Sequence, residues 1–261
     1  SLRRPHGVWQ AREKADEPRV KRMTRTDGLA YAAGAVGLGA VSLVFGDFAL
    51  QWQPVPADTP ARTPLAYASG GLLIIAGLMI LSGRLRAPGA GLLALFYAFW
   101  VVALHGPRVA AAPANVSMWL GFSEILSLAA AGALLATAAS APKLRSTALV
   151  VYGLCPLAFG LSHFVYAEFT AAMVPEWIPA RLFWAYATGA AHVAAGLAIL
   201  IGFLARPAAM LLTLMMGLFV LLLHVPRVIA SPTSHLEWTM IFVALSLTGA
   251  AWAVAASLRR D

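Results

Sequence analysis

Charged residues make up only 11% of this 261-residue chain, whereas hydrophobic residues make up 60%. Roughly a quarter of the residues of a soluble domain are charged, so the composition excludes an ordinary soluble protein and indicates an integral membrane protein. The net charge of +8 does not indicate nucleic acid as a partner, because eight of the nineteen Lys and Arg residues lie within positions 1–28, before the first apolar run. A basic segment in this place is typical of contact with the anionic lipid of a bilayer.

After this basic N-terminal segment, the chain consists of apolar runs joined by short polar connections. Most runs have about the twenty residues that a helix needs to cross a hydrocarbon core of about 30 Å. The sequence therefore predicts an all-α polytopic membrane protein with eight transmembrane helices. The apolar runs are residues 29–50, 64–82, 89–105, 118–140, 148–172, 182–204, 207–225 and 238–257.

Basic residues are unevenly divided between the two sides of these predicted spans. The termini and the even-numbered loops hold fifteen Lys and Arg residues, and the odd-numbered loops hold four. The positive-inside rule therefore predicts that both termini are cytoplasmic and that the odd-numbered loops face the outside. The four outer basic residues are Arg62, Arg108, Arg181 and Arg227.

A short motif occurs twice and divides the membrane region into two units. His105-Gly106-Pro107-Arg108-Val109 returns 119 residues later as His224-Val225-Pro226-Arg227-Val228. Each copy follows the third apolar run of its unit, so residues 29–140 and 146–257 have the same in/out order. The repeat predicts two parallel, pseudo-symmetric four-helix bundles related by an axis along the membrane normal. Small residues at matched positions, Gly70 with Gly189 and Gly77 with Gly196, favour close helix packing.

The two motif copies are the first candidates for chemistry. We expect each proline to end regular helix, so that His105 with Arg108, and His224 with Arg227, point into one space at the outer face. A guanidinium suits an oxyanion, and an imidazole exchanges protons near neutral pH. The functional interpretation is a site for a small oxyanion or a quinone head group, with the histidines as catalytic residues. The structural alternative is a helix C-cap, in which both side chains bind the last carbonyls.

Acidic and aromatic residues near the same face extend this hypothesis. Carboxylates at this depth are costly, so we expect them to pair with the motif arginines and histidines. Asp47 and Glu168 are predicted to pass protons and Glu124 to contact the ligand; the alternative is a set of structural ion pairs. The repeated aromatic residues are further candidates for ligand contact, with an aromatic belt as the alternative for the tryptophans. These are Tyr67, Tyr186, Trp119 and Trp238.

Two intramembrane histidines occur only in the second unit. Ser42 and Leu73 hold the places of His163 and His192 in the first unit. The pair is a candidate for a haem b or metal site, although we expect the two rings to lie at different depths. The alternative is a pair of histidines that hydrogen-bond between helices. The single cysteine, Cys155, excludes an internal disulfide and a thiolate metal cage.

The motif and the residues that follow it resemble the DoxX-like family of bacterial integral membrane proteins. The resemblance covers residues 29–257 as two tandem four-helix units, whereas that family has a single unit. It implies a bacterial inner membrane location and, as in some members, quinone-linked oxidation of sulfur compounds with a redox partner subunit. The most similar segments are Leu223-His224-Val225-Pro226-Arg227-Val228, Glu237-Trp238 and Leu245-Ser246-Leu247-Thr248-Gly249-Ala250.

Three functions are compatible with these features. The first is a membrane redox component, such as a quinone-linked oxidoreductase subunit, that binds a quinone or a small oxyanion near the outer face. The second is a carrier or channel whose two halves move around a central cavity. The third is a non-catalytic assembly subunit in which the motif serves as a helix cap.

Overall fold

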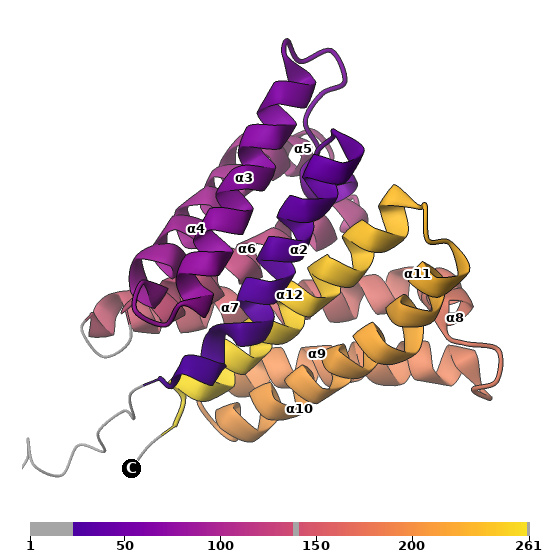
Figure 1. Ribbon diagram of the computed structural model, residues 1–261. Coiled ribbons are helices and arrows are strands. Elements are labelled where there is room, and N and C mark those ends of the chain that lie inside the picture. Colours follow the sequence, from indigo (N-terminus) through magenta and orange to yellow (C-terminus); the bar gives the residue numbers. More distant parts are fainter. Residues whose placement is uncertain (1–22, 138–140, 260–261) are drawn as a thin grey trace, which may run out of the picture.

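The computed structural model describes residues 23–137 and 141–259, and Figure 1 shows their arrangement. In this part of the chain the regular structure is entirely helical, and eight helices are long and apolar enough to cross a membrane. The all-α class and the prediction of eight helices long and apolar enough to span a membrane are therefore confirmed for the described residues. Residues 1–22 of the predicted N-terminal segment, residues 138–140 at the end of the first predicted unit, and residues 260–261 lie outside the described residues.

Long helices account for most of each span, and short helical turns extend or connect them. The long helices are α2 (Leu29–Phe45), α3 (Arg62–Leu81), α4 (Arg86–Trp100), α6 (Val116–Thr137), α7 (Pro142–Val165), α9 (Arg181–Ile201), α10 (Ala205–Phe219) and α12 (His235–Ser257). The short elements are η1 (Arg25–Gly28), η2 (Leu50–Trp52), η3 (Val101–His105), α5 (Gly106–Ala111), α8 (Ala167–Met173), η4 (Val220–His224) and α11 (Val225–Ala230).

The prediction that the third helix of each unit ends at the motif is wrong. Helix α4 continues through the π-helical turn η3 into α5, and α10 continues through η4 into α11. A proline removes one N–H and crowds the carbonyl four residues earlier. A π turn bonds across five residues and so relieves this crowding. Accordingly, the N–H of Gly106 donates to the carbonyl of Val101, and that of Val225 to the carbonyl of Val220.

Helix packing follows the same order in the two halves, which we define as residues 29–140 and 146–257. The contact of α2 with α3 matches that of α7 with α9, and α4 with α6 matches α10 with α12. The fourth helix of each half also packs on the first helix of the other half, α6 on α7 and α12 on α2. Helices α2 and α12 thus run side by side (Figure 1), and the two halves share an extensive interface.

Close approach between helices depends on glycines that recur at the repeat spacing. A Cβ atom added at Gly77 would lie 2.9 Å from the carbonyl oxygen of Ala32 on α2. A Cβ atom added at Gly196 would lie 2.7 Å from the carbonyl oxygen of Gly153 on α7. Both distances are too short for a real side chain, so the predicted close packing at this pair of positions is confirmed.

The helix ends that carry the motif loops meet across the two halves. We call this end, with connections 46–61, 112–115, 166–180 and 231–234, the motif end. The ring of Phe45 stacks on His235 of the second half, with ring centroids 4.5 Å apart. In the matching place, the hydroxyl of Tyr166 donates to Oδ1 of Asn115 in the first half at 3.4 Å. The cross-half packing therefore extends to the motif end.

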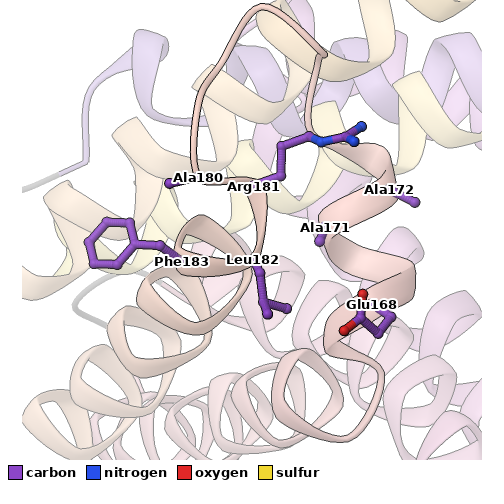
Figure 2. Close-up of a pocket in the computed structure, with 7 residues that line it drawn as sticks. All are labelled: Glu168, Ala171, Ala172, Ala180, Arg181, Leu182 and Phe183. Carbon is purple, nitrogen blue, oxygen red and sulfur yellow. The ribbon is translucent and has the colours of Figure 1, made fainter.

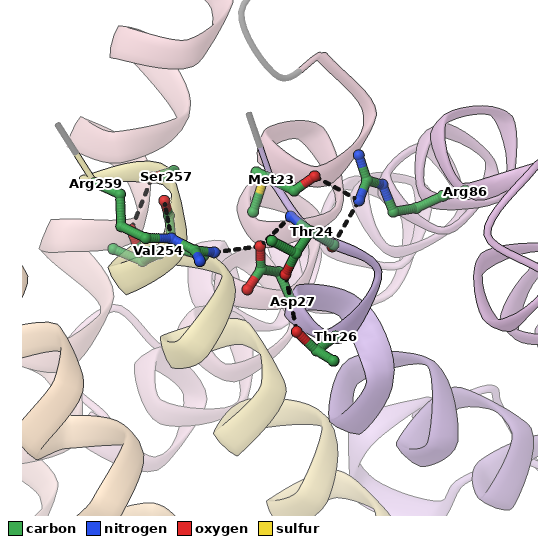
Figure 3. Close-up of polar contacts among 9 residues, drawn as sticks. Met23, Thr24, Thr26, Asp27, Arg86, Val254, Ser257 and Arg259 are labelled. Atoms are coloured by element: carbon green, nitrogen blue, oxygen red, sulfur yellow. Dashed lines mark hydrogen bonds and ion pairs between the residues drawn. The ribbon is translucent and has the colours of Figure 1, made fainter. Parts of the chain in front are cut away.

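The opposite end, which we call the terminal end, is closed by arginines that bind the first described residues (Figure 3). The carboxylate of Asp27 is buried and forms an ion pair with Arg259, which follows α12. Arg86, at the start of α4, donates to the carbonyls of Met23 and Thr24. These contacts tie the chain before α2 to the beginning of α4 and the end of α12.

We predict that Asp27→Asn lowers the free energy of unfolding by ~2 kcal/mol, because it removes a charged acceptor from a buried ion pair. Thermal and denaturant unfolding of the detergent-purified chain measure the change. Asp58→Asn is the matched control, because Asp58 is exposed in the α2–α3 connection. Equal stability of the two variants would show that the terminal-end ion pair is not stabilising.

Candidate functional site

In the first half, the connection between α2 and α3 folds back into the helices beside the motif. Its turn η2 buries Trp52, which is only 5% exposed. The indole Nε1 of Trp52 donates to Oε2 of Glu124 at 2.7 Å. Nε2 of His105 lies 3.0 Å from the carbonyl oxygen of Trp52, and because a carbonyl only accepts, His105 is the donor. The motif histidine and Glu124 therefore both hold Trp52 in place.

Two more contacts fix the same connection. The side chains of Gln53 and Ser69 exchange hydrogen bonds. Arg62, the first residue of α3, lies 2.7 Å from the carboxylate of Asp47 and donates to two backbone carbonyls of the loop. The expectation that Asp47 pairs with a motif arginine such as Arg108 is therefore wrong. The loop brings Arg62 closer, so Asp47 has a structural ion-pair partner.

In the second half, the motif arginine binds the start of the next long helix. Arg227 makes two hydrogen bonds to Glu237, of 2.9 Å from Nε and 2.8 Å from a terminal nitrogen. Ser234 caps the start of α12, because its hydroxyl accepts a hydrogen bond from the N–H of Glu237. The C-cap alternative requires Arg227 to bind the last carbonyls of its own helix. Arg227 binds Glu237 instead. Met118 holds the place of Glu237 in the first half, and Arg108 there is exposed, with no hydrogen bond or ion pair among the described residues.

The motif histidine of the second half has a different environment from its counterpart. His224 is 8% exposed, and within the described part of the chain its Nδ1 is buried without a hydrogen-bond partner. Val243 holds the place of Glu124, so the second half lacks the carboxylate that fixes Trp52 in the first. The two motif copies therefore support different loop structures.

The repeated aromatic residues also have matched positions. The indoles of Trp119 and Trp238 each donate to a proline carbonyl six residues earlier in the chain, both at 2.9 Å. Tyr67 and Tyr186 are 46% and 47% exposed on the second helices of their halves. Each tryptophan thus closes its own loop, and ligand contact by the four aromatic residues stays a prediction.

An open pocket of about 530 Å³ lies at the motif end of the second half. Arg181 extends from the start of α9 toward α8, which carries Glu168 (Figure 2). Arg181 is the first residue of α9, as Arg62 is of α3, and each follows an alanine with a left-handed backbone. Within the described chain, Arg181 makes no hydrogen bond or ion pair, whereas Arg62 pairs with Asp47 and donates to two loop carbonyls. The pocket is lined by Glu168, Ala171, Ala172, Ala180, Arg181, Leu182 and Phe183.

His163 and His192 lie together in the core of the second half. Their ring centroids are 5.0 Å apart, so the prediction that they lie at different depths is wrong. The last turns of α7 bring His163 against the middle of α9, where Thr188 contacts both rings. Two axial imidazoles on one haem iron need ring centroids about 6 Å apart, with the porphyrin between them. The pair as placed here does not fit a bis-histidine haem b.

Comparison with known proteins gives a match in the second half. A family model described as a domain of unknown function, DUF8561, matches residues 152–257, from within α7 to the end of α12. The comparisons with curated proteins and with solved structures found no match.

The sequence does not single out four residues that the structure places at these sites. Arg62 and Arg181 were counted only as outer basic residues, although they are 119 residues apart and each precedes a second apolar run. That spacing was a usable signal. Trp52 and Thr188 carried no such signal, because their partners lie far away in the sequence or on the next helix.

We predict that Trp52→Phe lowers the free energy of unfolding by ~2 kcal/mol, because it leaves the carboxyl of Glu124 without its hydrogen-bond donor. Unfolding of the purified chain measures this loss. Trp119→Phe, which removes an exposed indole bond, is the matched control and should cost less than half as much. Replacing both partners, as Trp52→Phe with Glu124→Leu, should recover part of the stability; no recovery would contradict the pairing.

Proposed function

We propose that the chain is an integral protein of the bacterial inner membrane, built of two parallel four-helix units with both termini in the cytoplasm. The matched packing of the two halves supports the twofold arrangement. Eight apolar helices support insertion, and the excess of basic residues on the side of the termini supports the orientation. In this orientation the motif end faces outward.

We further propose that the protein is a redox-associated component that binds the head group of a lipid-soluble quinone, or a small oxyanion, in the pocket of the second half. The observation that carries this proposal is the contrast between two equivalent arginines. Arg62 is neutralised by Asp47 and the loop carbonyls, whereas Arg181 borders open space. A guanidinium without an internal partner is a ready donor for acceptor oxygens of a ligand.

The pocket walls suit a ligand with a polar head and an apolar remainder. Alanines 171, 172 and 180 leave room beside Arg181, and the exposed side chains of Leu182 and Phe183 provide apolar surface toward the lipid. Glu168 supplies a carboxylate at the same place and is the group that exchanges protons with a bound head group. Membership of the DoxX-like family, which we also propose, would imply quinone-linked chemistry of this kind.

A structural role is the second candidate for the motif itself. Arg227 binds Glu237, and His105 binds the backbone of Trp52, so these side chains hold helices and loops together. We therefore assign ligand binding to the pocket and assembly of the motif end to the motif. His224, whose Nδ1 has no hydrogen-bond partner among the described residues, remains a candidate ligand contact.

The test is quinone retention by the full chain purified from bacterial membranes and analysed by lipid extraction. Arg181→Ala should lower retained quinone at least tenfold, because it removes the guanidinium donor that the proposal assigns to the head group in the pocket. Ala172→Leu should have a similar effect by filling the pocket without a change of charge. Arg108→Ala, which removes another exposed arginine of the motif end, should have no effect.

A parallel titration with thiosulfate distinguishes the two ligand sources. Binding of thiosulfate that Arg181→Ala abolishes, without quinone retention, would identify an oxyanion site. Retention and thiosulfate binding that are both unchanged in Arg181→Ala and Ala172→Leu would refute the proposed function.

A further inference from the structure

We propose that His163 and His192 form a site for a copper(I) ion in the core of the second half. The proposal is independent of the pocket ligand, because it depends on the imidazoles of α7 and α9 and on Thr188. None of these three residues lines the pocket.

The hydrogen bonds fix which ring nitrogen carries the proton. Nδ1 of His192 lies 2.8 Å from the carbonyl oxygen of Thr188, which only accepts, so this nitrogen is the donor. The hydroxyl of Thr188 donates to the carbonyl of Trp184 at 2.7 Å. That hydroxyl therefore accepts from Nδ1 of His163 at 3.0 Å, and the carbonyl of Ala185 accepts from the same nitrogen at 3.3 Å.

Both neutral rings consequently keep the lone pair of Nε2. No hydrogen bond involves Nε2 of either histidine among the residues that the structure describes. A metal-binding histidine normally donates its other ring N–H to a carbonyl or a similar acceptor, which orients the ring and fixes its tautomer. His163 and His192 each already donate the N–H of Nδ1 to an acceptor of this kind.

The distance between the rings fits a single bound ion. Two imidazoles that bind one ion at about 2 Å, with a tetrahedral angle between them, have ring centroids about 5 Å apart. The observed centroid distance is 5.0 Å, with the ring planes inclined at 48°.

The first half shows that helix packing does not require this histidine pair. Ser42 and Leu73, which hold the same two places, are both fully buried in the matching contact between α2 and α3. Gly70 and Gly189 mediate close approach in the two halves alike. This helix pair can therefore pack without imidazoles, because the first half has a small serine and an apolar leucine at the same two places.

The surroundings favour a monovalent ion that prefers nitrogen and soft ligands. No group of three or more His, Cys, Asp or Glu side chains converges at one point in the described part of the chain, so no carboxylate offsets a second positive charge. His192 lies eleven residues into α9, about 16 Å along the helix axis, at a depth where net charge is costly. The ring of Phe219 lies beside both histidines and that of Phe159 beside His192, and aromatic faces stabilise cations. Copper(I) meets these conditions better than a divalent ion.

The experiment is an anaerobic titration of the detergent-purified full chain with copper(I) in competition with bicinchoninate. We expect one ion per chain, and at least tenfold weaker binding in His163→Gln and in His192→Gln. Thr188→Val should weaken binding several-fold, because it removes the acceptor that orients His163. X-ray absorption of the loaded protein should show imidazole nitrogens about 2 Å from copper.

The control for folding is the double variant His163→Ser with His192→Leu, which introduces the pair that the first half uses. It should unfold at nearly the same temperature as the parent chain and lose the ion. His235→Gln, a histidine stacked on Phe45 at the motif end, should bind copper(I) normally. Copper(I) binding of equal strength in the parent and the double variant, or preferential retention of zinc(II) over copper(I), would overturn the proposal. Arg181→Ala should leave copper(I) binding unchanged, so that failure of this site and failure of the pocket are distinguishable.

Discussion

Polar groups inside an apolar helical protein must find partners within the chain, because lipid offers none. This constraint explains the internal contacts of both ends. Asp27 meets Arg259 at the terminal end, and Glu124 meets the indole of Trp52 near the motif end. The loop between α2 and α3 folds inward, and its Trp52 donates to the half-buried carboxylate of Glu124 on α6. Whether the polar side chains of a loop find partners of this kind decides whether the loop is held against the helices or leaves open space beside them.

The two halves apply this constraint to the same helical arrangement with different results. The first half satisfies its polar side chains from its own loop, through Asp47 with Arg62 and Trp52 with Glu124. The second half has a valine in place of Glu124, and it leaves Arg181 at an open pocket. Duplication therefore preserved the helix contacts, while the side chains between them diverged. This divergence is the reason why we propose ligand binding in the second half and not in the first.

The sequence predicted the features that depend on local pattern. Hydropathy indicated eight long helices, and the repeat spacing indicated which glycines approach a neighbouring helix, as at Gly77 and Gly196. It failed where the outcome depends on geometry that no single residue encodes. Pro107 was expected to end a helix, but a π turn before it lets the helix continue. The partners of Asp47 and the proximity of His163 to His192 depend on how loops and helices pack, so spacing along the chain did not reveal them.

The repeat also helps to separate structural from functional residues. A residue type that occurs at equivalent positions and makes the same bond in both halves, as Trp119 and Trp238 do, is explained by the shared architecture. A polar side chain present in one half, where the other half packs with an apolar one, is not explained in this way. His192, in the place of Leu73, is such a case. Arg181 differs in its contacts instead: it has no partner among the described residues, whereas its counterpart Arg62 pairs with Asp47. His192 and Arg181 both lie on α9, so this helix contributes to the pocket together with α8 and to the histidine pair together with α7.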